Sequence, residues 1–440
     1  MKKRRRARRG VSFGTVVMLS LTALVLAGFC TILPKLTGNT DVRIDASELA
    51  VAIDSSFSQI AAVSNAALKD RPATQGPQAT ILPPESLATA VPVTQPPKLS
   101  FTLCAAGSIK INSAVQKALT DEDGYRFNYL FEHLGNAMDA DLSIATLENN
   151  VISTAKLTDA NIPADVLASI RQAGVDALCL GYYGALDGGV EGLAETKRNI
   201  EAAGMKPYGV YASEAERNQH TVMNVNGLSV ALLSYQNELS GTGKKKTTKE
   251  ERAFAIASQQ LPTIASDIAA AREAGAQVVV VSLCWGKVGA TSPTNTQKEL
   301  AQGIADAGAD IILGTHTGAL QTVQILTANR GDGKYHPVLC AYSLGNLFTY
   351  DRDKRVSLAS ILLNAEVVYD AVNDTVAFDN LSYTPTYSWR DKEDGKTRYR
   401  VLLNNGNYPE YVDKDQQNVM ERCLKLVDEA MTDAPLSAKQ

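Results

Sequence analysis

The sequence predicts an α/β protein in which helices cover packed β-sheets. From Leu99 onward, short apolar runs alternate with stretches whose apolar residues recur at helical spacing, as far as the run at 310–313. Beyond Gln321, strand-like runs dominate the chain. Alternating strands and helices followed by β-rich sequence are typical of layered folds with helices outside the sheets.

The elements expected in the globular part follow from these periodicities. The expected strands cover 101–107, 142–148, 176–181, 221–225, 228–235, 278–284, 311–313, 322–326, 336–342, 358–369 and 375–384. The expected helices cover 128–138, 163–173, 190–203, 261–274, 294–307 and 410–431. Asn226-Gly227 predicts a tight hairpin turn. Residues 241–252 are glycine-bearing and charged, which indicates a mobile loop; its lysines are a candidate contact for an anionic polymer, and a solvated loop is the alternative.

The composition is that of a soluble globular protein with a large core. The chain has 440 residues, of which 45% are hydrophobic and 20% charged, close to the usual composition of such proteins. The net charge of −4 and the pI near 5.7 show no overall basic excess. We therefore expect no nucleic-acid partner.

The amino terminus predicts a membrane anchor. Residues 1–10 carry seven Lys and Arg side chains, and residues 11–33 are uncharged and largely apolar. At ~1.5 Å per residue, a helix over this run covers the ~30 Å hydrocarbon core of a bilayer, and the preceding cations keep the amino terminus inside the cell. No A-x-A cleavage site follows closely, and Phe29 precedes Cys30 where a lipoprotein signal needs a small residue. We expect a single-pass protein of the cell membrane with an extracytoplasmic globular domain.

Residues 34–98 are expected to join the anchor to that domain. Apolar residues at helical spacing over 41–68 predict a juxtamembrane helix, and the Pro/Thr/Ala-rich sequence of 69–98 predicts an extended linker. The globular domain is assigned to 99–401, and a C-terminal helix and tail to 402–440.

The cysteines predict buried free thiols. Four of the six lie in strand-like apolar runs: Cys104, Cys179, Cys284 and Cys340. Such cysteines behave as small hydrophobic residues. There is no C-x-x-C pair in the chain, so a cysteine-based metal site is not expected.

The loop that follows the run at 310–313 is a candidate site. Gly314 ends the apolar run, and His316 then stands between two threonines. Loops at the carboxyl ends of buried strands are where α/β sheets place their chemistry. The alternative is a surface loop with an incidental histidine.

Five motifs then match one family in order and spacing. They are T-L-E-N-N-V at 146–151, G-A-L-D-G-G-V-E-G-L at 184–193, S-L-C-W-G at 282–286, I-L-G-T-H-T-G-A-L-Q at 312–321 and Y-S-L-G-N-L-F at 342–348. From 99 to 401 the chain resembles the poly-γ-glutamate capsule biosynthesis (CapA-type) proteins of the calcineurin-like metallophosphoesterase superfamily. The resemblance implies a four-layer α/β sandwich, an extracytoplasmic position and a dinuclear metal site.

The metal-site motifs depart from the family pattern. The family's G-D is Gly107-Ser108 here, its N-N-H is Tyr182-Tyr183-Gly184, the His of its H-W-G is Cys284, and the second His of its G-H-x-H is Gly318. The polar positions that still match are Glu148, His316 and Asn346. A dinuclear centre needs several carboxylate and imidazole ligands. We therefore expect no metal cofactor, with Glu148 and His316 as weak candidates for holding a single ion.

Aromatic residues enter the vacated positions. Tyr182 and Tyr183 stand where ligands are implied, and Trp285 belongs to a neighbouring motif. Tyrosines bury a large area while keeping a hydroxyl for hydrogen bonding. They predict either a plug that fills the former site or an aromatic platform for a sugar ring or a peptide.

The leading functional hypothesis is an accessory or binding component in capsule or cell-wall polymer synthesis. Its expected partners are the membrane, an anionic or cell-wall polymer, and polymer-synthesis proteins. The alternative is an enzyme. It would be a metallohydrolase rebuilt around Glu148 and His316, or a hydrolase with Cys284 as nucleophile and His316 as base.

Overall fold

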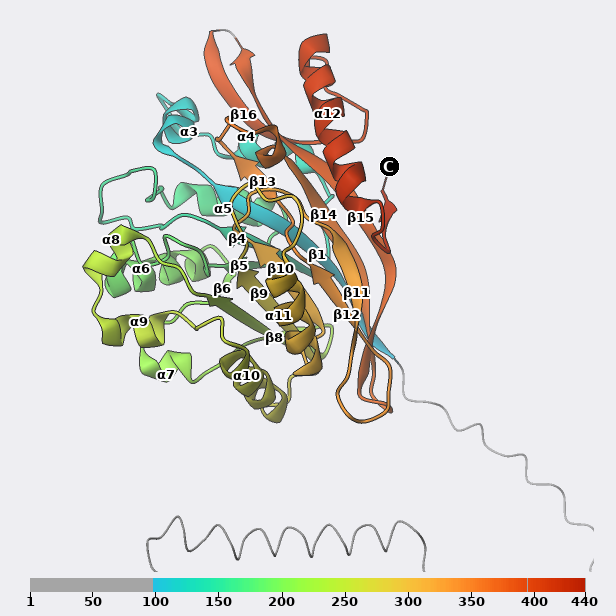
Figure 1. The fold of residues 1–440 in the computed structure, drawn as a ribbon. Coiled ribbons are helices and arrows are strands. Elements are labelled where there is room, and N and C mark those ends of the chain that lie inside the picture. Colours follow the sequence, from blue (N-terminus) through green and yellow to red (C-terminus); the bar gives the residue numbers. More distant parts are fainter. Residues whose placement is uncertain (1–97, 394, 440) are drawn as a thin grey trace, which may run out of the picture. The chain divides into compact units, whose positions relative to one another are not determined.

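The computed structural model describes residues 98–393 and 395–439 (Figure 1). The predicted anchor over 11–33, the juxtamembrane helix and the linker lie outside the described residues. Within the described part, no helix is both long and apolar enough to cross a membrane.

The larger sheet has nine strands in the described part of the chain. Its order is β16-β15-β14-β1-β4-β5-β6, with β13 paired to β1 and β17 to β15. β1, β4, β5 and β6 run parallel, whereas β14, β15 and β16 add antiparallel strands on the other side of β1. The strand bounds are β1 Leu99–Lys110, β4 Leu142–Leu147, β5 Ala177–Cys179, β6 Lys206–Tyr208, β13 Asn346–Thr349, β14 Ala359–Asp370, β15 Thr375–Glu393, β16 Lys396–Leu403 and β17 Ser437–Ala438.

The second sheet has six strands in the order β11-β12-β10-β9-β8-β7, counted over the described residues. β8, β9, β10 and β12 are parallel, and β7 and β11 close the two edges antiparallel. The bounds are β7 Thr221–Val225, β8 Leu228–Gln236, β9 Val278–Cys284, β10 Ile311–Thr315, β11 Val323–Ala328 and β12 His336–Ala341. Asn226 and Gly227 join β7 to β8 with φ of 50° and 85°, as the predicted hairpin turn requires.

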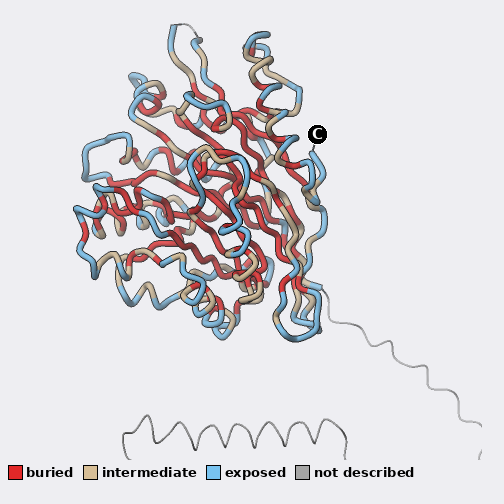
Figure 2. The backbone as a smooth tube through the Cα atoms, in the orientation of Figure 1, coloured by how far each residue is buried: buried red, intermediate tan, exposed pale blue. Residues whose placement is uncertain are grey.

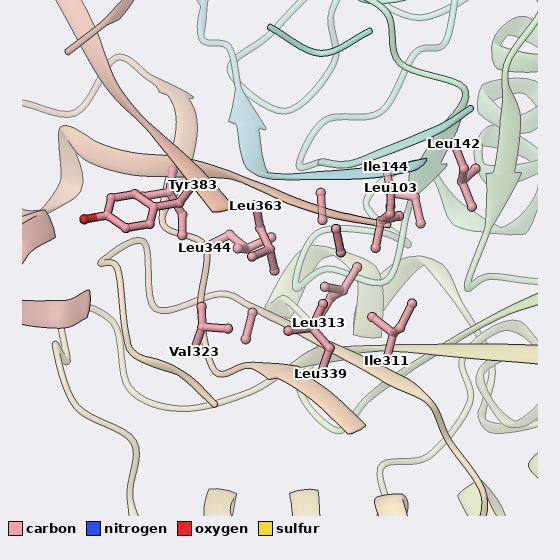
Figure 3. Packing of buried hydrophobic residues seen from close by; sticks show 14 of the residues in the cluster. Leu103, Leu142, Ile144, Ile311, Leu313, Val323, Leu339, Leu344, Leu363 and Tyr383 are labelled. Atoms are coloured by element: carbon pink, nitrogen blue, oxygen red, sulfur yellow. The ribbon is translucent and has the colours of Figure 1, made fainter. Parts of the chain in front are cut away.

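The two sheets pack face to face. Leu103, Ile144 and Leu363 of the larger sheet meet Leu313 and Leu339 of the smaller one in a single buried cluster (Figure 3). Figure 2 shows that burial is concentrated in these strands, while exposed backbone follows the loops and helices. Burying each such side chain contributes about 1.5–3 kcal/mol.

Helices cover the outer face of each sheet (Figure 1). α3 Ser113–Ala118, α4 Asn128–Phe131, α5 Asp165–Gln172 and α6 Gly189–Ala202 share a core with the larger sheet. α10 Leu261–Glu273 and α11 Asn295–Asp306 share one with the smaller sheet. The layered α/β sandwich predicted for this chain is therefore confirmed.

The smaller elements complete the list of bounds. They are β2 Thr120–Asp121, β3 Gly124–Tyr125, η1 Glu132–Leu134, α7 Glu214–Arg217, α8 Gly241–Lys246, α9 Lys249–Ala255, η2 Arg355–Ser357 and α12 Lys414–Met431. Cys423 and Val427 of α12 belong to the core between the sheets. β16 continues to Leu403, two residues beyond the position at which the sequence-based boundary ends the globular domain.

Two sequence-based predictions of elements are wrong. Residues 241–252 are not a loop but lie in α8 and α9. The Ser240 hydroxyl accepts from Gly243 N, and a capping box joins Thr248 to Glu251, so these helix ends are stabilised locally. The helix expected over 128–138 is shorter: α4 ends at Phe131, the 3₁₀ turn η1 continues to Leu134, and Gly135 ends it with a positive φ of 51°.

Asp310 anchors the start of β10 inside the smaller sheet. Its side chain is 1% exposed and accepts from Arg272 Nη2 at 2.6 Å, Arg330 Nη2 at 3.0 Å and Val279 N at 2.8 Å. A buried carboxylate needs such partners. This network holds β10, and therefore the loop after it, against β9.

Candidate functional site

The sequence-predicted site residues come together at one end of the sandwich. Ser108, Glu148 and Tyr183 lie at the ends of β1, β4 and β5 of the larger sheet, and Cys284 and His316 at the ends of β9 and β10 of the smaller sheet. Because all these strands run parallel within their sheets, their carboxyl ends meet at the same edge. Asn346 joins them, since β13 pairs beside β1 with Asn346 opposite Ser108.

Two cavities open at this end and together form what we call the cleft. The first has a volume of about 410 Å³ and is lined by Glu148, Tyr183, Gly318 and Asn346, among others. The second, of about 600 Å³, is lined by residues that include Cys284 and Trp285. His316 and Glu238 line both. These volumes lie in the ~300–1,000 Å³ range of small-molecule sites.

His316 has a strained backbone. Its φ is 84°, a left-handed conformation that costs a non-glycine residue about 1–2 kcal/mol. The imidazole is half-buried, and no hydrogen bond or ion pair to another described residue holds it. Strain of this kind clusters at binding and catalytic sites, and here it presents the imidazole to both cavities.

The two tyrosines have different environments. Tyr182 is 7% exposed and its hydroxyl has no hydrogen-bond partner among the described residues. Burial, with the nearby charges of Asp187 and Glu148, raises its pKa well above the usual value. Tyr183 is 45% exposed and lines the first cavity. Tyr182 therefore fills interior space, whereas Tyr183 offers an aromatic face to a ligand.

Gly184 has no room for the imidazole implied at this position. A Cβ at Gly184 would lie 2.9 Å from the Tyr182 ring and 3.1 Å from Asp187 Oδ2. A histidine side chain here would require both neighbours to move.

Cys284 is placed unfavourably for a nucleophile. Burial raises the pKa of its thiol well above the usual value, and the carboxylates of Glu148 and Glu238 add to that shift. The thiolate, which is the reactive form, is therefore scarce at neutral pH. No hydrogen bond joins this thiol to the His316 imidazole, although both residues are described.

Trp285 is fixed against the β12–β13 connection. Its indole Nε1 donates to the Tyr342 carbonyl at 2.8 Å, and the two rings stack with centroids 5.9 Å apart. This approach depends on Gly314, where a Cβ would lie 1.9 Å from the same carbonyl oxygen and 2.4 Å from the indole nitrogen. Glycine at 314 therefore lets β10 pass close enough for Trp285 to form the cavity wall.

Asn346 and Ser108 are held by the backbone around them. Asn346 Nδ2 donates to the carbonyls of Gly318 at 3.0 Å and Ser357 at 3.1 Å. Ser108 is 2% exposed, and its N–H donates to the Gly345 carbonyl. Both residues therefore brace the loops around the cleft.

Sequence reasoning missed four polar residues of this region. Lys110, Glu238 and Asp351 line the first cavity. Gln236, at the end of β8, is 2% exposed, and both polar atoms of its amide lack a partner in the described structure. Gln236 and Glu238 follow an apolar run, so the strand-end rule that selected His316 would have found them too.

A dinuclear metal centre does not fit these residues. Positions where the resemblance implies ligands hold Ser108, Tyr182, Gly184, Cys284 and Gly318. Serine and tyrosine hydroxyls are poor donors at neutral pH, glycine has no donor side chain, and Cys284 alone cannot replace the several carboxylate and imidazole ligands of a two-ion site. Over the described residues, no group of three or more His, Cys, Asp or Glu side chains is arranged to hold an ion.

Comparison with known proteins identifies the family. The profile described as "Bacterial capsule synthesis protein PGA_cap" matches residues 102–351, which is more than half of the chain and contains every motif of the cleft. The chain belongs to the bacterial capsule synthesis protein PGA_cap family. The family predicted from the motifs is thus confirmed.

Two relatives of this PGA_cap protein are bacterial. It is 28% identical over 234 residues to the PGA biosynthesis protein CapA of Bacillus subtilis strain 168, covering 51% of this chain and 56% of that protein. It is 25% identical over 261 residues to the capsule biosynthesis protein CapA of Bacillus anthracis, covering 57% and 60%. The matches thus span less than two thirds of either relative.

Solved structures resemble it more distantly. The calcineurin-like phosphoesterase YfkN from Bacillus subtilis matches 76% of this chain and 99% of that one, with 10% identity and a TM-score of 0.38. A hypothetical protein from Thermus thermophilus matches 66% and 98%, with 16% identity and a TM-score of 0.37.

Proposed function

We propose that this chain is a membrane-anchored, extracytoplasmic accessory or binding component of capsule or cell-wall polymer synthesis, in a cell that makes poly-γ-glutamate or a related polymer. Membership of the PGA_cap family supports the process, and the predicted anchor over 11–33 supports the location. The observation that supports the molecular role is that Ser108, Tyr182, Gly184 and Cys284 stand at the positions where the resemblance implies metal ligands.

The cleft keeps the features of a binding site. It is open, and Tyr183 and Trp285 give it aromatic surface beside the polar groups of Glu148 and His316. Aromatic walls with a few directed polar groups are how proteins bind sugar rings and peptide segments. The His316 strain presents an imidazole that nothing else in the described structure holds.

The charge of the cleft limits what it can bind. Glu148, Glu238 and Asp351 line the first cavity together with Lys110, so carboxylates outnumber the cations. None of these three carboxylates forms an ion pair with a described residue. Such a lining repels a polyanion and suits a neutral or amine-bearing ligand.

Complementation of a deletion strain tests this proposal, with the amount of surface polymer as the readout. Full-length protein should restore the polymer. The variant Glu148→Gln should restore it too, because glutamine keeps the size and the hydrogen-bonding capacity of the side chain that binding uses, whereas hydrolysis in a rebuilt site would need the carboxylate. If Glu148→Gln folds, as judged by its thermal melt, yet restores nothing, the chain is a hydrolase with a rebuilt site. If deletion leaves the polymer unchanged, the chain has no part in its synthesis.

Location is tested separately. If the proposed topology is correct, protease added to intact cells should remove the globular domain by cutting within residues 69–98. Protection in intact cells, with digestion only after lysis, would contradict the proposed topology.

A further inference from the structure

Gln236 is a buried polar residue beside the cleft whose side chain has no partner. It is 2% exposed, and its backbone N–H donates to the Ala257 carbonyl at 3.1 Å. Neither polar atom of its side-chain amide has a hydrogen-bond partner in the described structure. Leaving such a group unpaired is costly, and a ligand that pairs with it recovers that cost. An unpaired buried amide beside an open cavity therefore points to a ligand.

The strand register directs Gln236 toward the cleft. Gln236 of β8 is paired with Cys284 of β9, so the two side chains project from the same face of the smaller sheet. Two residues earlier on β9, the Ser282 hydroxyl lies 2.8 Å from the Tyr208 hydroxyl of the larger sheet, so this face looks toward the larger sheet. Cys284 lines the second cavity. The Gln236 amide therefore lies at the floor of the cleft, and no side-chain hydrogen bond to a described residue has to break for it to turn toward a ligand.

Carboxylates dominate the lining of both cavities. Glu148, Glu238 and Asp351 line the first cavity, where Lys110 is the one lysine or arginine among the described lining residues. Glu238 and Glu299 line the second, which has no lysine or arginine among its described lining residues. None of these four carboxylates forms an ion pair with a described residue. The cleft therefore attracts a cation and offers carboxylates that are free to pair with it.

Glu238 is the carboxylate best placed to meet a cationic group. Of the four, it lines both cavities, and it follows Gln236 by two residues. Burial chiefly raises the pKa of Cys284, and the charges of Glu148 and Glu238 add to that rise, so Glu238 acts close to the thiol beside Gln236. Its side chain forms no hydrogen bond with a described residue. An ammonium group at the junction of the cavities therefore gains a charge-assisted hydrogen bond.

Exposed apolar side chains border the same cavities. Tyr183 and Val288 line the first cavity and are 45% and 59% exposed, and Leu261 lines the second and is 38% exposed. Covering aliphatic side chains with the hydroxyl groups of a sugar ring leaves those hydroxyls without partners. An apolar side chain of a peptide covers the same surface without that cost. The border of the cleft thus favours a peptide over a sugar.

We propose that the cleft binds a peptide segment that carries a protonated amine, with Glu238 and Gln236 as the residues that select it. Glu238 accepts a hydrogen bond from the amine. The Gln236 amide both donates and accepts, and the N–H and C=O of one extended residue point to the same side, so the two groups pair. Tyr183 and Val288 cover an apolar side chain. This ligand class rests on the proposed binding role of the cleft and makes it specific.

The test measures binding of short probe peptides to the full chain by isothermal titration calorimetry. The peptide acetyl-Val-Lys-Val-amide should bind about tenfold more tightly than acetyl-Val-norleucine-Val-amide, which lacks the amine. Glu238→Gln should reduce that preference to less than about threefold, because the amine loses its carboxylate. The control Glu273→Gln removes an exposed carboxylate outside both cavities and should leave the preference unchanged.

Gln236→Met tests the amide separately. It should weaken binding of the lysine and norleucine peptides equally, by about tenfold, because both peptides share the backbone that the amide pairs with. The variant should unfold at the same or a higher denaturant concentration than wild type, because methionine removes an unpaired buried amide without leaving a cavity. Weaker binding by a variant of undiminished stability therefore reports the lost amide and not a folding defect.

Four outcomes would overturn the proposal. They are equal affinity for the lysine and norleucine peptides, the same loss of preference in Glu238→Gln and Glu273→Gln, wild-type affinity in Gln236→Met, and tighter binding of a glucosamine trimer than of the lysine peptide. Failure here is separable from failure of the proposed function. If polymer production needs the protein but the peptides do not bind as expected, only the ligand assignment fails. If they bind as expected while deletion leaves production unchanged, only the part in polymer synthesis fails.

Discussion

His316 allows a direct test of whether the cleft loop is held in a strained state. A left-handed φ of 84° costs a residue with a Cβ about 1–2 kcal/mol relative to glycine. Replacing His316 by glycine removes this cost, but glycine also stabilises the unfolded chain through its greater conformational freedom, by about 0.4–1 kcal/mol. His316→Gly should therefore be more stable than His316→Ala by about 0.5–1 kcal/mol. Neither variant removes a side-chain hydrogen bond to another described residue. The difference in unfolding free energy between the two variants therefore reports the backbone strain at position 316.

The assay is equilibrium unfolding in denaturant, with the free energy taken by linear extrapolation at unchanged slope. Lys287 supplies the control pair, because it is exposed in a neighbouring loop and its φ is not positive. There glycine should be less stable than alanine by about 0.4–1 kcal/mol, the reverse order. If His316→Ala proves at least as stable as His316→Gly, the loop is not strained at this residue and the argument from strain fails.

Three further predictions concern residues around the cleft. Gly314→Ala should lower the free energy of unfolding by at least about 3 kcal/mol, because the added methyl would overlap the Tyr342 carbonyl. The control Gly241→Ala, where a methyl would meet open space, should be nearly neutral. Similar melting temperatures for the two variants would contradict the packing described. Asp310→Ala should lower the free energy of chemical unfolding by about 3–5 kcal/mol, because Arg272 and Arg330 lose their buried partner. A decrease below about 1 kcal/mol would contradict a buried ion-pair network at this residue. Burial raises the pKa of Cys284, so iodoacetamide at pH 7.5 should leave its thiol unmodified while the free amino acid cysteine reacts fully. The rate of alkylation should increase as the pH rises, because the thiolate is the reactive form. Rapid alkylation of Cys284 at pH 6 would make it a candidate nucleophile again.

The sequence predicted the sheets better than the site. Runs such as 278–284 have buried residues on both faces, and no other element fits so short an apolar stretch between turn residues. Thr294 and Gln297 form the capping box that starts α11. The T-x-x-E pattern from Thr248 to Glu251 is equally readable, but the loop prediction for this segment rests on its glycines and charges and does not use that pattern. Local caps decided its structure.

The site could be predicted where a motif or the end of an apolar run marked it. His316, Cys284 and Glu148 stand in recognisable motifs, whereas Gln236 and Glu238 carry no motif and could be found only from their place at the end of β8, which lies beside β9. The strain at His316 could not be predicted, because histidine does not require a positive φ and only the fold imposes it.

The metal content of the full chain tests the central claim most directly. Protein purified from cells grown with manganese, zinc and iron, dialysed without chelator and measured by elemental analysis, should hold well below one ion per chain. The residues Ser108, Tyr182, Gly184 and Cys284 do not supply the carboxylate and imidazole ligands that a dinuclear centre needs. Two ions per chain that resist dialysis, and that are lost in the variant Glu148→Gln/His316→Ala, would contradict the account and make the cleft a rebuilt metallohydrolase site.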